Sequence, residues 1–201
     1  MTGVIHRRWI WLKRFRQRRG YGVHSPFAFN FLTYVVYERG TYYAYKWLKN
    51  KYFCMDYLWN GHRVKCRKFL FRLANFVHPQ TIAIFGKMDE ASVAYLSAGS
   101  VSSKVQQVEE SADTGDKLLV VGMDVPHARW RKILEYIHTE ESVCLIAGIH
   151  ASKSNLQAWR DLCQTNTVFV SFDLYDYGIL FFDSSKQKQH YIVNFYKMKK
   201  S

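Results

Sequence analysis

Residues 81–98 constrain the fold of this chain more strongly than any other stretch of its sequence. The apolar run Thr81–Phe85 is followed by a glycine, Gly86, a short polar loop and the helix-like run Ala91–Ala98. A short apolar strand that passes through a glycine turn directly into a helix is typical of the start of a doubly wound α/β sheet. We therefore predict an α/β fold of the Rossmann-like type.

The loop in this stretch is poor in glycine. Loops that hold a nucleotide cofactor in such sheets carry several glycines, because their backbone N–H groups must approach the ligand closely. Here Gly86 stands alone, and Asp89 and Glu90 add negative charge at the start of the helix. The pattern predicts a ligand-binding fold whose loop has lost most of the glycines that a cofactor site needs.

Positive charge is concentrated in the first part of the chain, which has 201 residues and a net charge of +13. Residues 1–80 contain 16 Lys and Arg and two acids, for a net charge of +14, whereas residues 81–201 have a net charge of −1. This asymmetry predicts a basic helical region over residues 1–79 and an α/β domain over residues 80–201.

The most basic segment is residues 6–19, HRRWIWLKRFRQRR, in which seven Lys and Arg mix with apolar side chains and no acid. Such a helix can lie on an anionic membrane surface, or track the phosphates of a nucleic acid while aromatic rings stack on bases. It can also dock its Trp and Leu on the protein and leave its charges in water. The sequence leaves these interpretations open. The contact residues predicted for an anionic partner are Arg14, Arg16, Arg18 and Arg19.

Apolar periodicity predicts the secondary structure of the rest. Ser25 is expected to cap a helix with Pro26 in its first turn, and Tyr42–Tyr57 and Arg63–Val77 are expected as two more helices. Strands are expected at Thr81–Phe85, Lys104–Val108, Lys117–Gly122, Ser142–Ala147 and Thr167–Asp173, and helices at Ala91–Ala98, His127–Thr139 and Asn155–Gln164. This alternation predicts a mostly parallel sheet. The β-rich runs Tyr177–Phe182 and His190–Tyr196 predict a carboxy-terminal hairpin.

The four cysteines are scattered and none forms a C-x-x-C pair, which favours reduced thiols in a cytoplasmic protein. The sequence shows no secretory signal pattern. Its apolar runs are shorter than the roughly 20 residues that a membrane-spanning helix needs. We therefore expect no transmembrane segment.

Two motifs near the ends of the chain point to a family. The residues HSPF stand at His24–Phe27, and the sequence DLYDYGILFF runs from Asp173 to Phe182. Together they resemble class I S-adenosylmethionine-dependent methyltransferases of a type common in Bacteroidetes, which open with an HSPF helix and close with a D-L-x-x-x-G-I/L-x-F-F hairpin. The similarity runs from about Gly20 to Phe195. It implies the class I methyltransferase sheet preceded by amino-terminal helices.

The functional positions of that family are only partly kept. In the family's cofactor loop, E-L-G-T-x-x-G, this chain keeps Gly86 and has Glu90 at the second glycine. Glu109 matches the acid that binds the cofactor ribose. The seven residues 110–116 replace a helix, a strand and a helix that help to build the adenine pocket, although a parallel crossover alone takes about a dozen residues. The resemblance therefore implies a sheet that is shortened in the middle.

Two hypotheses of function follow. The first is a degenerate, non-catalytic methyltransferase-fold protein that needs no cofactor and acts as a binding or scaffolding module through its basic region. The alternative is an active methyltransferase that binds S-adenosylmethionine at Gly86 and Glu109, with Asp124, His127 or His150 near the substrate. No metal site is expected, because Ala147 and Gly148 replace the paired aspartate that holds a divalent ion in related O-methyltransferases. The shortened sheet leaves an edge that a second copy of the chain could cover.

Overall fold

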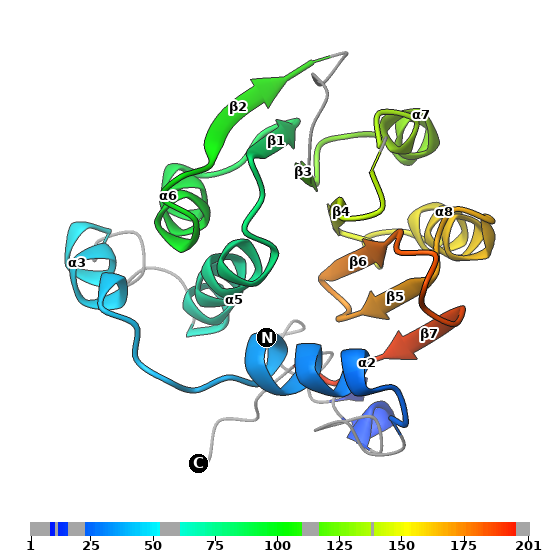
Figure 1. Cartoon of the computed structure of the whole chain (residues 1–201), viewed down its shortest axis with the longest axis horizontal. Coiled ribbons are helices and arrows are strands. Elements are labelled where there is room, and N and C mark those ends of the chain that lie inside the picture. The colour runs from blue at the N-terminus through cyan, green and yellow to red at the C-terminus, as the bar shows by residue number, and fades with distance from the viewer. Residues whose placement is uncertain are drawn as a thin grey trace.

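A seven-stranded sheet, with helices on both faces, forms the centre of the described part of the chain (Figure 1). The computed structural model describes residues 9–10, 12–15, 23–52, 61–109, 117–137 and 139–195. The strand order is β2-β1-β3-β4-β6-β5-β7. The strands are β1 (Thr81–Phe85), β2 (Lys104–Val108), β3 (Lys117–Val121), β4 (Val143–Ala147), β5 (Val170–Asp173), β6 (Tyr177–Phe181) and β7 (Gln189–Ile192).

The sheet is mostly parallel, as expected. β1 pairs with β2 and with β3, β3 pairs with β4, and β5 pairs with β7, all in parallel. β6 is antiparallel to both of its neighbours, β4 and β5. β1 to β5 and β7 therefore all end at one edge of the sheet, which we call the carboxyl edge. In open α/β sheets this is the edge that binds ligands.

The expected fold class is confirmed, but the carboxy-terminal hairpin is formed by different strands. It joins β5 to β6 through Leu174–Asp176, so the DLYDYGILFF motif itself forms the hairpin. β7 does not pair with β6 but lies beside β5, at the edge of the sheet. The apolar runs of β6 and β7 show that both are strands, but not which strands they pair with.

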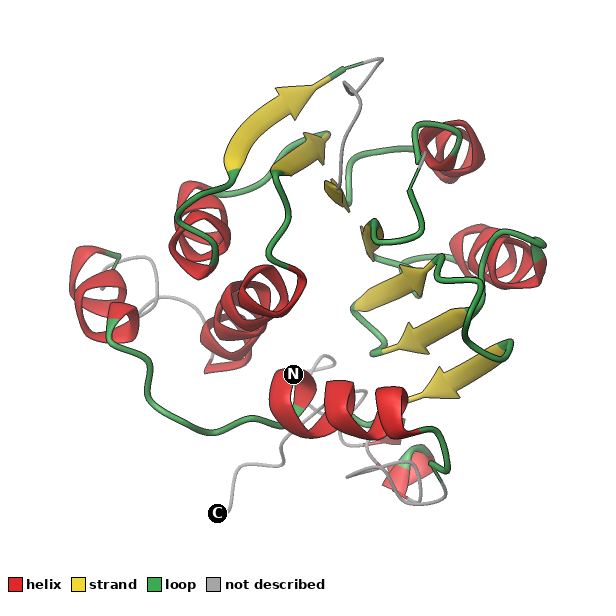
Figure 2. Cartoon of the chain, in the orientation of Figure 1, coloured by secondary structure: helices red, strands yellow, loops and turns green. Residues whose placement is uncertain are grey.

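Helices cover both faces of the sheet, which Figure 2 shows as a yellow layer between red helices. The helices are α2 (Pro26–Phe31), η2 (Leu32–Val36), α3 (Ala44–Lys51), α5 (Gly61–Val77), α6 (Glu90–Gly99), η3 (His127–Arg129), α7 (Trp130–Leu134) and α8 (Lys153–Gln164). Ser25 caps α2 as predicted, since its side chain accepts from the N–H of Ala28. The helix predicted for 127–139 is shorter and begins as the 3₁₀ turn η3.

The amino-terminal helices and the sheet share one core. α2, η2 and α5 bury their apolar side chains against one face of the sheet, with Phe31, Phe69 and Leu73 among the fully buried residues. Burial of each such side chain contributes about 1.5–3 kcal/mol to folding. α7 and α8 cover the opposite face through Trp130 and Trp159. The basic region and the α/β region predicted from charge are thus packed on each other.

Two arginines of α5 lie inside this packing. Arg67 is 3% exposed and its Nη2 lies 2.8 Å from Asp89 Oδ1. Arg72 is 5% exposed, and its Nε donates to Val35 O at 2.6 Å while Nη2 donates to Val36 O. These carbonyls end η2, where helix carbonyls lack partners within the helix and attract a cation. Part of the positive charge of residues 1–79 is therefore structural.

Candidate functional site

Side chains from the loop after β3 occupy the space beside the loop after β1. Gly86 has φ 79°, a left-handed conformation that suits glycine. A Cβ atom on Gly86 would lie 2.4 Å from Val125 Cγ2 and 2.6 Å from Asp124 Oδ1. Asp124 Oδ1 also accepts a hydrogen bond of 2.8 Å from the N–H of Lys87. The backbone donor beside Gly86 is thus used by a side chain of the protein itself.

A backbone N–H group at the start of α6 is likewise hydrogen-bonded to a side chain of the protein. Asp89 caps the helix, accepting from the N–H of Ser92 at 3.1 Å and from Ser92 Oγ at 2.5 Å. Burial alone would raise the pKa of Asp89, but the hydrogen bonds from Ser92 and the charge of Arg67 lower it. Asp89 is therefore a firmly charged carboxylate at the helix end where an anionic ligand group would sit.

Glu109 and His127 lie beyond these loops. Glu109 follows β2 at the carboxyl edge and is exposed, and its backbone carbonyl accepts from Arg129 Nη2 at 2.6 Å. His127 is exposed on η3, with its ring 6.4 Å from that of Trp130. Gly86 and Asp124 are thus in contact, whereas Glu109 is linked by its backbone to the short helix that carries His127.

His150 belongs to a separate, half-buried cluster at the carboxyl ends of β4 and β5. Its Nε2 lies 2.8 Å from Asp173 Oδ2 and 3.1 Å from Arg14 Nη2. Its ring stacks on Tyr175 at a centroid distance of 4.5 Å and an interplanar angle of 13°. Tyr175 has φ 76°, and its N–H donates to Asp173 Oδ1 at 2.8 Å. These contacts hold a backbone conformation that is unfavourable for a residue other than glycine.

Arg14 makes most of the contacts of this cluster, which corrects its prediction as a contact residue for an anionic partner. It is 8% exposed, and its two Nη atoms lie 2.9 and 3.0 Å from the two carboxylate oxygens of Asp173. It also donates to the backbone carbonyls of Asp173 and Val193. A guanidinium that is buried against a carboxylate in this way is not available to an external anion. Arg16, Arg18 and Arg19 lie outside the described residues.

Asp173 remains ionised because of these contacts. Burial would raise its pKa, but hydrogen bonds from His150 and Arg14 and the positive charge of Arg14 lower the pKa to about 2. Such a carboxylate is a poor general base, because its affinity for a proton is low. The cluster ties the amino-terminal segment to the carboxyl edge, and it is better suited to holding structure than to moving protons.

Sequence reasoning missed Asp173 and Tyr175 as partners of His150. The available signal was a lone aspartate ending an apolar strand, since a buried carboxylate requires a cation or several donors. The sequence gives no sign that Arg14, 159 residues away, is that cation.

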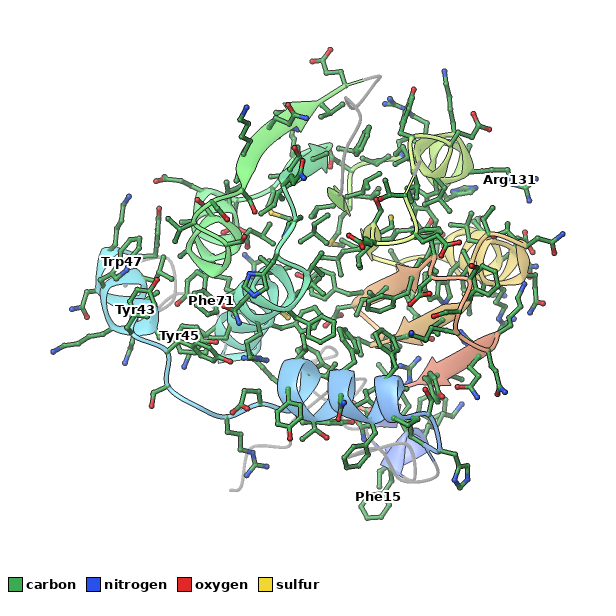
Figure 3. The ribbon with its side chains drawn as sticks, viewed as in Figure 1. Phe15, Tyr43, Tyr45, Trp47, Phe71 and Arg131 are labelled. Carbon is green, nitrogen blue, oxygen red and sulfur yellow. The ribbon has the colours of Figure 1, made fainter. Side chains whose placement is uncertain are left out.

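Three apolar side chains in the segment around Arg14 are exposed. Trp9, Leu12 and Phe15 are 53%, 62% and 41% exposed, whereas Ile10 is buried. Figure 3 shows Phe15 projecting away from the body of the protein. The Nζ of Lys13 lies 3.4 Å above the Trp9 ring. The interpretation in which Trp and Leu dock on the protein is thus wrong for Trp9 and Leu12.

The residues present do not fit S-adenosylmethionine held as in class I methyltransferases. In such sites the loop after the first strand and the following helix offer backbone donors to the ligand. Here Asp124 accepts from Lys87, and Asp89 accepts from Ser92. At these two positions a bound amino acid carboxylate would meet a carboxylate of the protein in place of a free N–H group. Within the described ranges, no group of three or more His, Cys, Asp or Glu is arranged to hold a metal ion.

Comparison with solved structures finds distant likeness in fold. No protein-family model matches this sequence, and no curated protein matches it. Among solved structures, the chain is similar to the SAH-bound methyltransferase PaMTH1 of Podospora anserina, with a TM-score of 0.48 and 11% sequence identity. The likeness covers 72% of this chain and 90% of that chain.

No helix in the described part of the chain is long and apolar enough to cross a membrane.

Proposed function

We propose that this chain is a methyltransferase-fold protein that has lost the cofactor site and works as a binding or scaffolding module. The strand order, the antiparallel β6 and the HSPF and DLYDYGILFF motifs support the relationship to class I methyltransferases. The scattered cysteines, of which Cys144 and Cys163 are buried, favour a cytoplasmic location.

One observation carries the loss of the cofactor site: Asp124 takes the N–H of Lys87 and fills the space above Gly86. A ligand at this loop would have to displace a hydrogen-bonded carboxylate and the packed side chain of Val125. β2 forms an edge of the sheet in the described part of the chain. Beyond it the family would place the strand and helix that wall the adenine pocket.

The partner of the proposed module is anionic, either a nucleic acid or a lipid surface. Lys13 and the exposed Trp9, Leu12 and Phe15 combine a cation with apolar side chains, two of them aromatic. Residues 16–19 add three arginines. An anionic lipid surface would take the apolar side chains into its headgroup region. A nucleic acid would stack on the rings and bind the cations.

The alternative is an active methyltransferase with Glu109 at the cofactor ribose. Its support is that the exposed Glu109 directly follows β2 and that Gly86 keeps the left-handed conformation of a ligand-binding loop. For activity, the loop after β3 would have to move Asp124 away from Lys87.

Thermal unfolding with S-adenosylmethionine separates the two. A cofactor at about 100 times its dissociation constant stabilises the folded state by about 2.7 kcal/mol, which would raise the melting temperature by about 5–10 °C for a domain of this size. We expect no rise at about 1 mM cofactor, with a methyltransferase of known affinity as positive control. A saturable rise that is lost in Glu109→Ala would refute the proposal.

The anionic partner is tested by salt-dependent binding. Binding to RNA, DNA and anionic vesicles is measured for the full chain and for the triple variant Arg16→Gln, Arg18→Gln, Arg19→Gln. We expect the triple variant to bind more weakly and with a shallower salt dependence. The matched control replaces the exposed cations Arg131, Lys132 and Lys153 of α7 and α8 by Gln. Equal losses in both triple variants would show a nonspecific effect of net charge.

A further inference from the structure

A second surface, far along the chain from the basic amino terminus, lies on the outward face of α3. Tyr43, which precedes the helix, is 79% exposed, and Trp47 is 47% exposed. Residues four apart are neighbours on a helix surface, about 5–6 Å between their Cβ atoms. In Figure 3 both residues are labelled at α3, and Phe71 lies toward the body of the protein on α5. Both rings are therefore open to solvent, at positions one helical turn apart.

The segment that carries these rings is anchored by the buried side of α3. Tyr45 packs on Phe71 at a centroid distance of 5.0 Å, and Leu48 is fully buried. Tyr45 also accepts from Arg72, the arginine that closes η2. A platform on a packed helix presents its rings with little loss of conformational freedom on binding.

Positive charge surrounds the pair and is not neutralised within the segment. Residues 39–52 contain four cations, Arg39, Lys46, Lys49 and Lys51, and no acid; all four are exposed. On the adjoining α5, burial lowers the pKa of Lys68, and the charges of Arg72 and Lys49 lower it further. The face thus has a positive field that attracts an anionic chain.

A groove of about 490 Å³ adjoins the platform. It is lined by Tyr43 and its neighbour Tyr42, by the end of α5, and by the carboxy-terminal end of α6 with the residues after it. Its polar lining consists of Asn75, His78, Ser100 and Ser102. The volume is in the range of about 300–1,000 Å³ typical of sites for small groups. Amide, imidazole and hydroxyl groups can hydrogen-bond to base edges or to ribose.

We propose that the α3 face, with Tyr43 and Trp47 as its stacking platform and the adjoining groove, binds single-stranded nucleic acid. Unpaired bases stack on exposed aromatic rings regardless of sequence, and lysines beside the rings follow the phosphates. This combination of rings, cations and a polar groove is what the surface offers. The inference goes beyond the proposed function and does not depend on whether the cofactor site is lost.

A duplex and a lipid surface fit this face less well. Bases in a duplex are stacked on each other, so their faces are closed to protein rings. A lipid surface is bound by a broad apolar helix face. The exposed positions are Tyr43 before α3 and Lys46, Trp47, Lys49, Asn50 and Lys51 on it, with no aliphatic residue among them.

The test is fluorescence anisotropy with labelled single-stranded RNA and DNA of mixed sequence, about 20 nucleotides long, enough for several bases beyond the platform. Binding is measured in the background of the Arg16, Arg18 and Arg19 triple variant, which removes the contribution of the basic amino terminus. Tyr43→Ala and Trp47→Ala are each expected to weaken binding at least about fivefold, the lower end of base–ring stacking. Trp47→Phe keeps a ring and should bind within about threefold of its parent.

The matched control is Tyr34→Ala, because Tyr34 is 61% exposed on η2, away from the α3 face, and should leave binding unchanged. All three alanine variants should keep their melting temperatures within about 2 °C, because exposed side chains contribute little to stability. The proposal is overturned if Tyr43→Ala and Trp47→Ala bind as Tyr34→Ala does. It is equally overturned if the two substitutions weaken binding to a duplex or to phosphatidylserine vesicles but not to single strands.

Discussion

Loss of the Arg14 side chain should destabilise the protein far more than loss of an exposed cation. Arg14→Met leaves Asp173, whose side chain is 5% exposed, without its bidentate partner. Removing one partner of a buried ion pair typically costs about 3–5 kcal/mol, because the remaining charge stays desolvated. We expect a loss in this range for the free energy of unfolding at pH 7, measured by urea denaturation.

The pH dependence of stability gives a second estimate of how much the ionised Asp173 contributes to the free energy of unfolding. The pKa of Asp173 falls from 3.8 to about 2 on folding, and at 1.36 kcal/mol per pKa unit this corresponds to about 2.4 kcal/mol. Since the folded pKa is the lower one, this stability is present above about pH 4 and is lost as the pH falls toward about 2. In Arg14→Met the pKa of Asp173 should rise, so the loss over this interval should shrink.

The control is the exposed pair formed by Lys186 and Asp183, whose side chains are 34% and 36% exposed. Lys186→Met should cost no more than about 1 kcal/mol, as exposed ion pairs do. If Arg14→Met costs no more than Lys186→Met, the cluster does not hold the amino-terminal segment to the carboxyl edge, and our reasoning is refuted.

Three further predictions concern stability. Gly178→Ala should lower the free energy of unfolding by about 1–3 kcal/mol through overpacking, because its Cβ would lie 2.4 Å from the Trp159 ring. Gly40→Ala, whose Cβ would face only the side chain of Glu38, should cost less in the same urea titration. Arg72→Met should lower the free energy of unfolding by about 1–3 kcal/mol, because it leaves the carbonyls of Val35 and Val36 buried without their donor. Lys132→Met, at an exposed site, should be neutral. Equal losses in the two variants would contradict the capping role of Arg72. Burial lowers the pKa of His190 from 6.5, so stability should fall as the pH decreases below about 6.5, and His190→Asn should flatten that part of the profile in thermal unfolding.

The strands of the sheet could be predicted from sequence because each is a short apolar run between polar turns. β1 and β2 have the bounds predicted, and β3 and β4 differ by one residue at one end. Strand pairing could not be predicted in the same way. The turn between β5 and β6 depends on Tyr175 in a left-handed conformation, which local residue preferences do not favour outside glycine.

The candidate site was predicted less completely, because its key contacts join distant residues. Gly86 and Asp124 were both identified from the sequence, but only the fold shows that Asp124 accepts from the N–H of Lys87. The charge of Arg14 was visible, while its burial depends on a carboxylate in the second half of the chain. The net charge of a segment does not show which of its cations are exposed.

The most direct test of the filled loop follows the amide signals of Lys87 and Ser92 by NMR while S-adenosylmethionine is added. Because both N–H groups already donate to carboxylates of the protein, their chemical shifts should stay constant up to about 1 mM cofactor, a concentration that would saturate an ordinary site. Saturable shifts of both amides would contradict the account, since they would place the ligand where Asp124 and Asp89 now bind.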